Sequence, residues 1–481
     1  MSWSGLFFLL YHAVAIVTII YIVMDNRQPA KTMAWALVIY FVPVVGILLY
    51  IFFGANTRKE RYVGRRSMDE LTKRSMLKYV EQRDLQLPDT HQSLISLFIN
   101  QSFSLPFRYH GVQFLTDGYQ FFPSLLRDIA QARDHIHVDM YIFEDDALGR
   151  LMSDALIQKS SEGVAVRVIY DDVGCWSVGS SFFERMREAG IEVVPFMPVR
   201  FPRFTSRANY RNHRKIIVID GRVGYIGGMN IALRYVKGRD DSRETGKNLW
   251  RDTMARIEGS AVYALQRTFL IDWYFVDRTL LSDRKFYPPM PEQQEPGGTS
   301  LIQVVTSGPG KPNPEIMQGF VRIIMAARRY IYIETPYFLP TESVLLALKT
   351  AVSMGIDVRV LVPRRSDAHF TDWASRSYLR EALVSGMQVL FYEEGFLHSK
   401  FMVSDDTVST CGSTNIDFRS FENNFEANAF FYDADAACRL RDIFLDDVRQ
   451  ATPLTDIPHR LHPRFMARMG ESFARLLSPL L

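Results

Sequence analysis

The sequence is poor in cysteine and has almost no excess charge of either sign. Of its 481 residues only three are cysteines, Cys175, Cys411 and Cys438, which are far apart and form no CxxC pair. This excludes a disulfide scaffold and a cysteine-held zinc site, and it favours a reducing compartment for most of the chain. The 56 basic and 53 acidic side chains leave a net charge of +3, which excludes a polycation that binds nucleic acid over its whole surface. Any anion-binding chemistry must therefore be local.

Charge is absent from two stretches near the N-terminus. Residues 1–24 and 32–57 contain no Asp, Glu, Lys or Arg, and about 20 apolar residues are enough to cross a bilayer core about 30 Å thick. We therefore expect two transmembrane helices, over 4–24 and 32–54. More basic residues follow the second stretch than lie between the two, so the positive-inside rule predicts a cytoplasmic location for everything after residue 57. A cleaved signal peptide is disfavoured because no basic residue precedes the first stretch. Buried core helices are disfavoured because helices of this length in a core usually carry a polar face.

The remainder of the chain contains two similar halves. Two segments dense in β-branched and aromatic residues, 136–143 and 331–338, are typical of buried strands. Each is followed by a helical stretch and by further strands that begin with glycine, in the same order. This order predicts an α/β fold in two homologous halves with mostly parallel sheets. We divide the chain into a two-helix hairpin (1–57), a basic connector (58–109), a first half (110–285), a linker (286–300), a second half (301–450) and an amphipathic tail (451–481).

A pattern of chemically reactive residues occurs once in each half. It reads His-x-Lys-x4-Asp, then a Gly-Gly or Gly-Ser pair fourteen residues after the His, and Asn seventeen residues after it. A single His-x-Lys on a strand is usually a solvated face, but the whole spacing is duplicated, which indicates a shared site. The pattern is formed by His213, Lys215, Asp220, Gly228 and Asn230, and by His398, Lys400, Asp405, Ser413 and Asn415.

The two patterns resemble the paired HKD motifs of the phospholipase D superfamily. The layout of charge-free N-terminal stretches before two such halves is similar to that of bacterial cardiolipin synthases, and segments 26–35, 43–46 and 475–481 resemble the ends of that subfamily. The resemblance implies one active site built by both halves. It implies that His213 becomes a phosphohistidine and that His398 acts as general acid and then base, although from the sequence the two could be exchanged. The implied catalytic set is His213, Lys215, Asp220, His398, Lys400 and Asp405.

These residue types can transfer a phosphodiester without a metal or another cofactor. They supply a nucleophile, a proton donor and positive charge around the non-bridging oxygens. An imidazole pKa of about 6.5 would let one ring be neutral while the other is protonated. We expect Asp220 and Asp405 to hold the backbone rather than to touch substrate. The residues expected to bind phosphate or to orient the site are Asn230, Asn415, Ser413, Gly228, Glu426 and Asp252.

Each catalytic ring also needs a carboxylate on its second nitrogen. Glu426, 28 residues after His398, resembles the orienting acid of the family in its placement. Asp252 is the analogous candidate in the first half, although an insertion lengthens its spacing from His213 to 39 residues.

Three further features have two interpretations each. We interpret His135 and His137 as sheet packing rather than as zinc ligands, because Tyr332 replaces His137 in the second half. The arginines in 200–214 are either a solvated face or a site for anionic headgroups. The tail 464–481 has its apolar residues near one helical face, and it lies at a membrane surface or packs against the halves.

The predicted reaction is the reversible transfer of a phosphatidyl group from one phosphatidylglycerol to another, which gives cardiolipin and glycerol. We expect it at the bacterial cytoplasmic (inner) membrane, with the halves on the cytoplasmic side, no nucleic acid partner, and an oligomeric state left open. The alternatives are a membrane-anchored phospholipase D or nuclease, a synthase that uses phosphatidylethanolamine as co-substrate, and a lipid-binding scaffold. A metal-dependent CDP-alcohol transferase would have an aspartate-rich motif that this sequence lacks.

Overall fold

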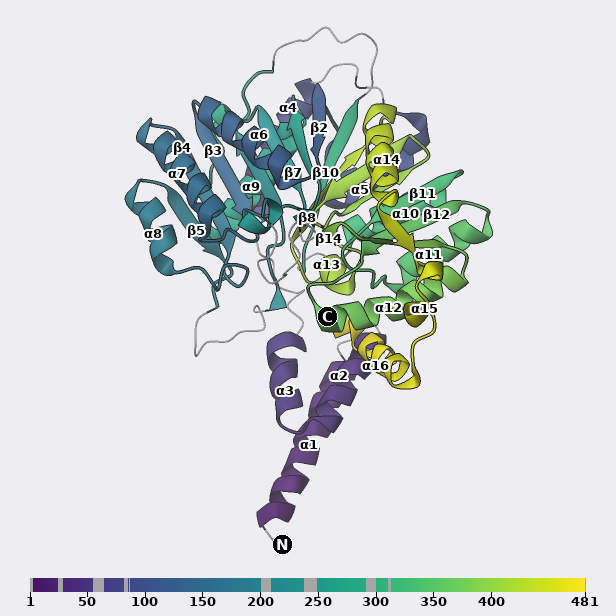
Figure 1. Ribbon diagram of the computed structural model, residues 1–481. Helices are drawn as coiled ribbons and strands as arrows, with labels where there is room; N and C mark the ends of the chain where they lie inside the picture. The colour runs from purple at the N-terminus through teal and green to yellow at the C-terminus, as the bar shows by residue number, and fades with distance from the viewer. Residues whose placement is uncertain are drawn as a thin grey trace.

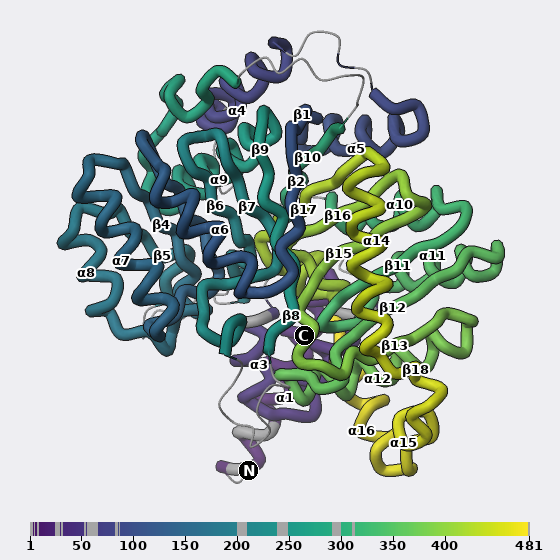
Figure 2. The backbone as a smooth tube through the Cα atoms, turned by 45° about the horizontal axis from the view of Figure 1, so that its top comes forward, coloured from purple at the N-terminus to yellow at the C-terminus, as the bar shows by residue number. Residues whose placement is uncertain are grey.

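The computed structural model describes residues 3–24, 29–54, 65–81, 85, 87–199, 209–237, 249–290, 300–309 and 313–480. Two α/β halves lie side by side, the first in blue to teal and the second in green to yellow, and the N-terminal helices project from one end (Figures 1 and 2). In each half several helices pack on one face of the sheet, and a single long helix packs on the other face.

The first half is built on a seven-stranded sheet. Its order is β2 (Gly111–Leu115), β9 (Met254–Glu258), β7 (Val223–Gly227), β6 (Lys215–Ile219), β3 (His135–Met140), β4 (Ala165–Asp171) and β5 (Glu192–Phe196). One face is covered by α6 (Gly118–Gln131), α7 (Ala147–Ser161) and α8 (Ser180–Glu188), and the other by α9 (Val262–Asp277).

The second half is built on a nine-stranded sheet. Its order is β1 (Phe107–Arg108), β10 (Leu301–Ser307), β17 (Glu426–Phe431), β16 (Val408–Gly412), β15 (Phe401–Ser404), β11 (Tyr330–Glu334), β12 (Asp357–Pro363), β13 (Gln388–Tyr392) and β18 (Ala451–Pro453). One face is covered by α10 (Glu315–Ala326), α11 (Glu342–Ser353) and α12 (His369–Val384), and the other by α14 (Ala434–Val448).

Both sheets are mixed, so the prediction of mostly parallel sheets is wrong. Only β3–β4–β5 and β11–β12–β13 run parallel, and the other neighbours in the two sheets are antiparallel. One source of the antiparallel pairing is the hairpin that follows each motif histidine, β6–β7 in the first half and β15–β16 in the second. The two central residues of its turn have positive φ, Asp220 and Gly221 in the first half and Asp405 and Asp406 in the second. This is the conformation of a type I′ turn, which joins antiparallel strands.

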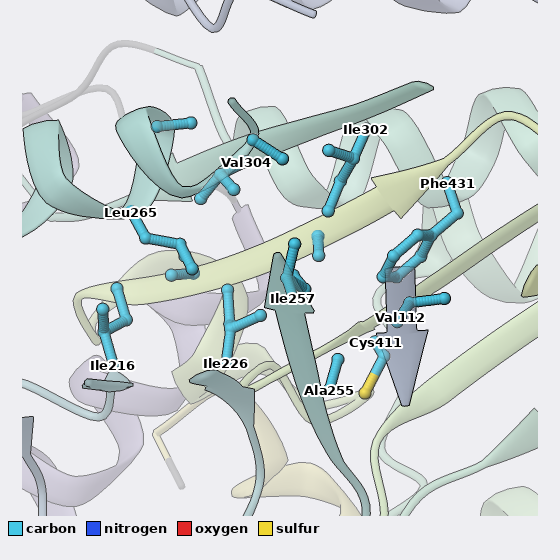
Figure 3. Packing of buried hydrophobic residues seen from close by; sticks show 14 of the residues in the cluster. Val112, Ile216, Ile226, Ala255, Ile257, Leu265, Ile302, Val304, Cys411 and Phe431 are labelled. Carbon is cyan, nitrogen blue, oxygen red and sulfur yellow. The ribbon is translucent and has the colours of Figure 1, made fainter. Parts of the chain in front are cut away.

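A common hydrophobic core joins the two halves. Strands and a helix of the first half meet β10, β16 and β17 of the second half there, as Figure 3 shows. Burial of this much apolar surface stabilises one fixed arrangement of the halves. The labelled side chains are Val112, Ile216, Ile226, Ala255, Ile257, Leu265, Ile302, Val304, Cys411 and Phe431.

Elements of the connector 58–109 contact both halves. The connector 58–109 contains α4 (Arg65–Glu81), which packs on α9, and α5 (Gln92–Ser102), which packs on α10. Its strand β1 joins the second sheet by pairing with β10. Residues 55–64, with three of the basic residues that support the topology prediction, lie outside the described residues, as does most of the linker, 291–299.

The N-terminal segment forms α1 (Trp3–Met24), α2 (Pro29–Phe41), α3 (Val45–Leu49) and a π-helical turn over Tyr50–Gly54. The helix expected over 32–54 is therefore interrupted. Pro43 cannot continue a helical hydrogen-bond ladder, and Val44 has a φ of 63°. None of the helices within the described ranges combines the length and the apolar character needed to cross a membrane, so the structure does not confirm the two predicted spans.

The C-terminal helix α16 (Phe465–Leu476) packs on α12 and keeps an apolar face exposed. Its inner face buries Ala474 and Glu471, and Glu471 forms an ion pair of 2.5 Å with Arg380 of α12. Phe465 is 77% exposed and Phe473 is 59% exposed. The tail therefore packs against the second half and still presents aromatic side chains to its surroundings.

Candidate active site

Both histidines of the repeated pattern line one cavity between the halves. His213 lies two residues before β6, and His398 lies between β14 (Gly395–Leu397) and β15. The cavity has a volume of about 310 Å³, and Asn230 and Asn415 also line it. The structure thus brings the histidines and asparagines of both copies of the pattern to one place.

Main-chain hydrogen bonds connect the two halves at each histidine. β14 pairs in parallel with β8 (Leu249–Arg251), and the His398 N–H donates to the Arg251 carbonyl at 2.7 Å. On the opposite side the His213 N–H donates to the Phe425 carbonyl at 2.9 Å. The backbones of Asn212 and Phe425 form an isolated parallel β-bridge there. Each segment that leads to a histidine is therefore bonded to the segment that leads to the acidic residue of the other half.

The orienting carboxylates consequently act across the two halves. His213 Nδ1 lies 3.0 Å from Glu426 Oε1, and His398 Nδ1 lies 2.6 Å from Asp252 Oδ2. We expected each acid to serve the ring of its own half, so this pairing is a correction. The crossed backbone pairing is its cause. In both pairs the ring N–H donates to the carboxylate, which leaves Nε2 available for chemistry.

The residues at the Gly-Gly and Gly-Ser positions support these carboxylates. The Ser413 hydroxyl donates to Glu426 Oε2, and the Asn424 side-chain amide donates to Oε1 at 3.2 Å. Gly228 occupies the corresponding position in the first half, where a Cβ would collide with the carboxylate of Asp252. We expected Gly228 and Ser413 to bind phosphate or to orient the site, and their contacts fit the orienting role.

The two lysines lie buried beneath the histidines. Lys215 Nζ donates to the His213 carbonyl at 2.6 Å, and Lys400 Nζ donates to the His398 carbonyl. Asn415 donates from its side-chain amide to Asp417 at 3.1 Å, and Asn230 donates to the Tyr235 hydroxyl at 3.3 Å.

The two aspartates of the pattern lie away from the cavity. The Asp220 carboxylate accepts backbone N–H bonds from Arg133, Asp134 and His135 at 2.8–2.9 Å. Asp405 accepts bonds from 328, 329 and 330 in the same way. Each carboxylate thus ties the turn of its hairpin to the start of the neighbouring strand.

Burial controls the protonation of the site. Desolvation lowers the pKa of His213 to about 4, although Glu426 opposes the change, and it lowers the pKa of His398 well below its ordinary value. Both rings are therefore neutral near pH 7 before a substrate binds, rather than one neutral and one protonated as we expected. Desolvation also lowers the pKa of Lys215 to about 7, with Glu426 opposing and Lys400 adding to the decrease.

The two orienting acids differ in strength. Burial raises the pKa of Asp252 to about 6, although Lys400 opposes this effect. Burial acts in the same direction on Glu426, but the charge and hydrogen bond of His213, with Lys215 and Ser413, outweigh it and hold the pKa of Glu426 below its ordinary value. Glu426 therefore stays ionised, whereas Asp252 can share a proton with His398.

Sequence reasoning missed several residues that line the cavity. The Tyr141 ring meets His213 edge-on with centroids 4.8 Å apart, and the Trp250 ring lies 4.9 Å from that of His398. Tyr337, Asp367 and Arg419 line other parts of the wall. Tyr141 and Tyr337 lie in the repeated strand segments, just after β3 and β11, where ligand sites of parallel strands form. That position was a signal for both tyrosines.

The other sequence candidates have structural contacts. His137 stacks on Phe269 with centroids 4.3 Å apart, and His135 bonds to Gln266, which agrees with sheet packing. Of the arginines in 200–214, Arg211 and Arg214 are buried and form ion pairs with Asp171 and Asp272. The others lie outside the described residues. The two that can be placed do not form an exposed basic face.

Comparisons with known proteins agree with this fold. The family described as "Cardiolipin synthase, PLD-like domain" matches residues 125–250 and 320–448, and "Phospholipase_D-nuclease N-terminal" matches 13–54. The crystal structure of phosphatidylserine synthase from Haemophilus influenzae Rd KW20 shares the fold, with a TM-score of 0.62 at 14% identity over 82% of this chain and 100% of that one.

Relatives found by sequence comparison show which family of phospholipase D-like proteins the chain belongs to. The chain is 39% identical to a cardiolipin synthase of Geobacillus kaustophilus, over 99% of this chain and 94% of that protein. It is 37% identical to the major cardiolipin synthase ClsA of Bacillus subtilis, over 99% of this chain and 98% of that protein. The chain belongs to the cardiolipin synthase family of phospholipase D-like proteins.

The space at Gly228 gives a test of the Asp252–His398 pair. We expect Gly228→Ala to push the Asp252 carboxylate away from the His398 ring, because the new methyl group would occupy its place. Loss of such a supporting contact should lower kcat by about 10- to 100-fold. Steady-state product formation and circular dichroism would measure activity and folding. Gly111→Ala is the control, since no atom lies within 4 Å of its Cβ position. Equal rates for the two variants would contradict the role given to this contact.

Proposed function

We propose that the enzyme transfers the phosphatidyl group of one phosphatidylglycerol to a second phosphatidylglycerol, which forms cardiolipin and releases glycerol. The proposal depends on one observation above all, that two imidazoles with carboxylates on their inner nitrogens face one cavity. Such a pair can serve as a nucleophile and as an acid and base for the same phosphorus atom.

His213 is the better nucleophile of the two. Its ring is neutral at physiological pH, and its Nδ1–H donates to Glu426, so Nε2 carries a lone pair toward the cavity. When Nε2 attacks phosphorus, the ring becomes positively charged. The ionised Glu426, held by Ser413 and Asn424, stabilises that charge. Asp252 lacks a hydroxyl partner at Gly228 and is the weaker acid, so it suits a ring that must repeatedly gain and lose a proton.

In the first step the bond from His213 Nε2 to phosphorus forms while the bond from phosphorus to the glycerol oxygen breaks. The departing oxygen takes a proton from His398. Burial lowers the pKa of His398 well below its ordinary value, so the ring is neutral before substrate binds. The negative charge of the entering phosphodiester raises this pKa again, and the ring then gains its proton. Lys215, Lys400 and the amides of Asn230 and Asn415 provide positive charge and N–H groups for the phosphate.

In the second step the neutral His398 removes the proton from the terminal hydroxyl of the second lipid. That oxygen attacks phosphorus, the bond to His213 breaks, and cardiolipin forms. Attack by water instead would give phosphatidic acid, so the cavity must favour a lipid hydroxyl over water.

We further propose that the N-terminal helices hold the enzyme in the cytoplasmic membrane, with the halves on its cytoplasmic side. Large apolar side chains of α1, such as Leu9 and Tyr21, are exposed, and the helices share a small core that includes Trp35. Exposed apolar surface of this extent is typical of a membrane contact. The turn η7 (Ser478–Leu480) contacts both α2 and α13 (Phe418–Glu422), and α13 lines the cavity. The membrane segment would therefore lie near the active site.

The reaction itself is tested with purified protein, labelled phosphatidylglycerol and no added metal. We expect equimolar cardiolipin and glycerol, and a loss of at least about a thousandfold in His213→Ala and in His398→Ala, because nucleophile and acid act as a unit. An alkaline quench followed by peptide mapping should find the phosphatidyl label on His213. Phosphatidic acid without cardiolipin would identify a hydrolase, and label on His398 would exchange the two roles.

The pH dependence of kcat/KM should have an acid limb from His213 and an alkaline limb from Lys215. His213 must be neutral to attack, and its pKa of about 4 means that activity falls only as the pH drops toward that value. Lys215 must be charged, and its pKa of about 7 means that activity falls as the pH rises through neutrality. Lys215→Arg keeps the charge and should move the alkaline limb upward. An alkaline limb that stays near pH 7 in this variant would assign it to another group.

The membrane location predicts two results from cell fractions. The protein should remain in the membrane after an alkaline carbonate wash, because its contact is apolar rather than electrostatic. Protease should digest the catalytic halves in sealed inside-out vesicles and leave them intact in right-side-out vesicles. Release by carbonate would rule out an embedded segment, and the opposite protease pattern would reverse the topology.

A further inference from the structure

The cavity is asymmetric although the chain that forms it is duplicated. On the side of the second half, Asp367 lines the cavity from the loop between β12 and α12. Asp417 also lines it, but both of its carboxylate oxygens already accept hydrogen bonds, from the Asn415 amide and the Ser420 N–H. The end of β4 and the loop after it have a comparable place in the first half, but Asp171 and Asp172 there accept backbone N–H bonds. Among the described residues of the first half, no carboxylate lines the cavity. A negative charge therefore faces the cavity from the second half only.

Asp367 is held in place at the exposed part of the cavity wall. Its Oδ1 accepts a hydrogen bond of 2.6 Å from the hydroxyl of Tyr337, and the side chain as a whole is exposed at the cavity wall. Its charge acts on the nearby His398 ring, where it opposes the decrease in pKa that burial and Lys400 cause. Within the described part of the chain, Asp367 Oδ2 has no hydrogen-bond partner, so it can accept a bond from a ligand.

The chemistry of a carboxylate limits what can bind beside it. A phosphate would be repelled, so the phosphodiester lies nearer the lysines and asparagines. A hydroxyl donates well to a carboxylate, and such charge-assisted bonds are about twice as strong as neutral ones. In the proposed reaction the groups that approach His398 are the departing glycerol and the glycerol headgroup of the second lipid. Each carries a further hydroxyl next to the reacting oxygen.

We propose that Asp367, positioned by Tyr337, binds the glycerol group beside His398. While His398 exchanges a proton with the reacting oxygen, Asp367 accepts a hydrogen bond from the adjacent hydroxyl. The same contact serves the leaving glycerol in the first step and the attacking lipid in the second. Water has no second hydroxyl to offer, so this contact favours transfer over hydrolysis. The inference rests on the proposed function and names the part of the cavity that recognises the diol.

The reverse reaction isolates this contact, because cardiolipin and free glycerol then give two molecules of phosphatidylglycerol. In mixed micelles, the KM for glycerol should rise about tenfold or more in Asp367→Ala, since a hydrogen bond to a charged group is lost. The preference for glycerol over 1-propanol, as the ratio of kcat/KM values, should fall by a similar factor. Tyr337→Phe should cause a smaller change in the same direction. Glu342→Ala, which removes an exposed carboxylate of α11 outside the cavity, is the control and should match the unchanged enzyme.

The outcomes separate this inference from the proposed function. If the unchanged enzyme makes no cardiolipin from phosphatidylglycerol and consumes none with glycerol, the proposed function itself fails. If it does both, and Asp367→Ala keeps the KM for glycerol, the diol contact is rejected. A rise in KM together with more phosphatidic acid per cardiolipin in the forward reaction supports it. Tighter binding of ethanolamine than of glycerol by the unchanged enzyme would overturn the assignment to a diol.

Discussion

The active site depends on the crossed pairing of main chain between the two halves. β8 pairs with β14, and the residues before His213 pair with those before Glu426. These few hydrogen bonds place the acid of each half behind the histidine of the other. Neither half therefore contains a complete imidazole–carboxylate pair, and the core shared by the two sheets keeps them in register (Figure 3). The hairpins anchored by Asp220 and Asp405 hold the strands that follow each histidine, so the motif aspartates act on geometry at a distance.

Burial gives this geometry its electrostatic character. Two lysines, two histidines and two acids share a site from which water is largely removed, and desolvation lowers the pKa of Lys215 to about 7 and of His213 to about 4. With both rings neutral, the charges of the lysines and acids nearly cancel. An entering phosphodiester adds the negative charge that the lysines can stabilise and that lets a ring take up a proton. The negative charge of the substrate thus both attracts the lysines and raises the pKa of His398, the general acid.

The sequence was most informative where chemistry is repeated. The duplicated spacing identified the histidines, lysines and asparagines that the structure brings together, while the aspartates of the pattern lie at the hairpin turns. Asp-Gly at 220–221 was an unused signal for the first of these hairpins. The exchange of Glu426 and Asp252 could not be read from spacing, because it follows from contacts between segments remote in the chain. An insertion before Asp252 obscured its relation to His213 further. Asp367 belongs to no repeat, so nothing in the sequence separated it from an ordinary surface carboxylate.

Duplication produces two equal imidazole–carboxylate pairs, but a two-step transfer needs unequal ones. The inequality arises from small differences at matched positions. Burial raises the pKa of Asp252 to about 6, whereas at Glu426 the interactions with His213, Lys215 and Ser413 outweigh burial and keep the acid ionised. Ser413 gives Glu426 a hydroxyl donor that Gly228 cannot give Asp252. Glu426 stabilises a charged phosphohistidine, and Asp252 allows His398 to change protonation state twice in each cycle. Asp367 adds a negative charge on the His398 side alone, where hydroxyl groups rather than phosphate must lie. A symmetric fold thereby supports a directional reaction, because the side chains around its two histidines are no longer equivalent.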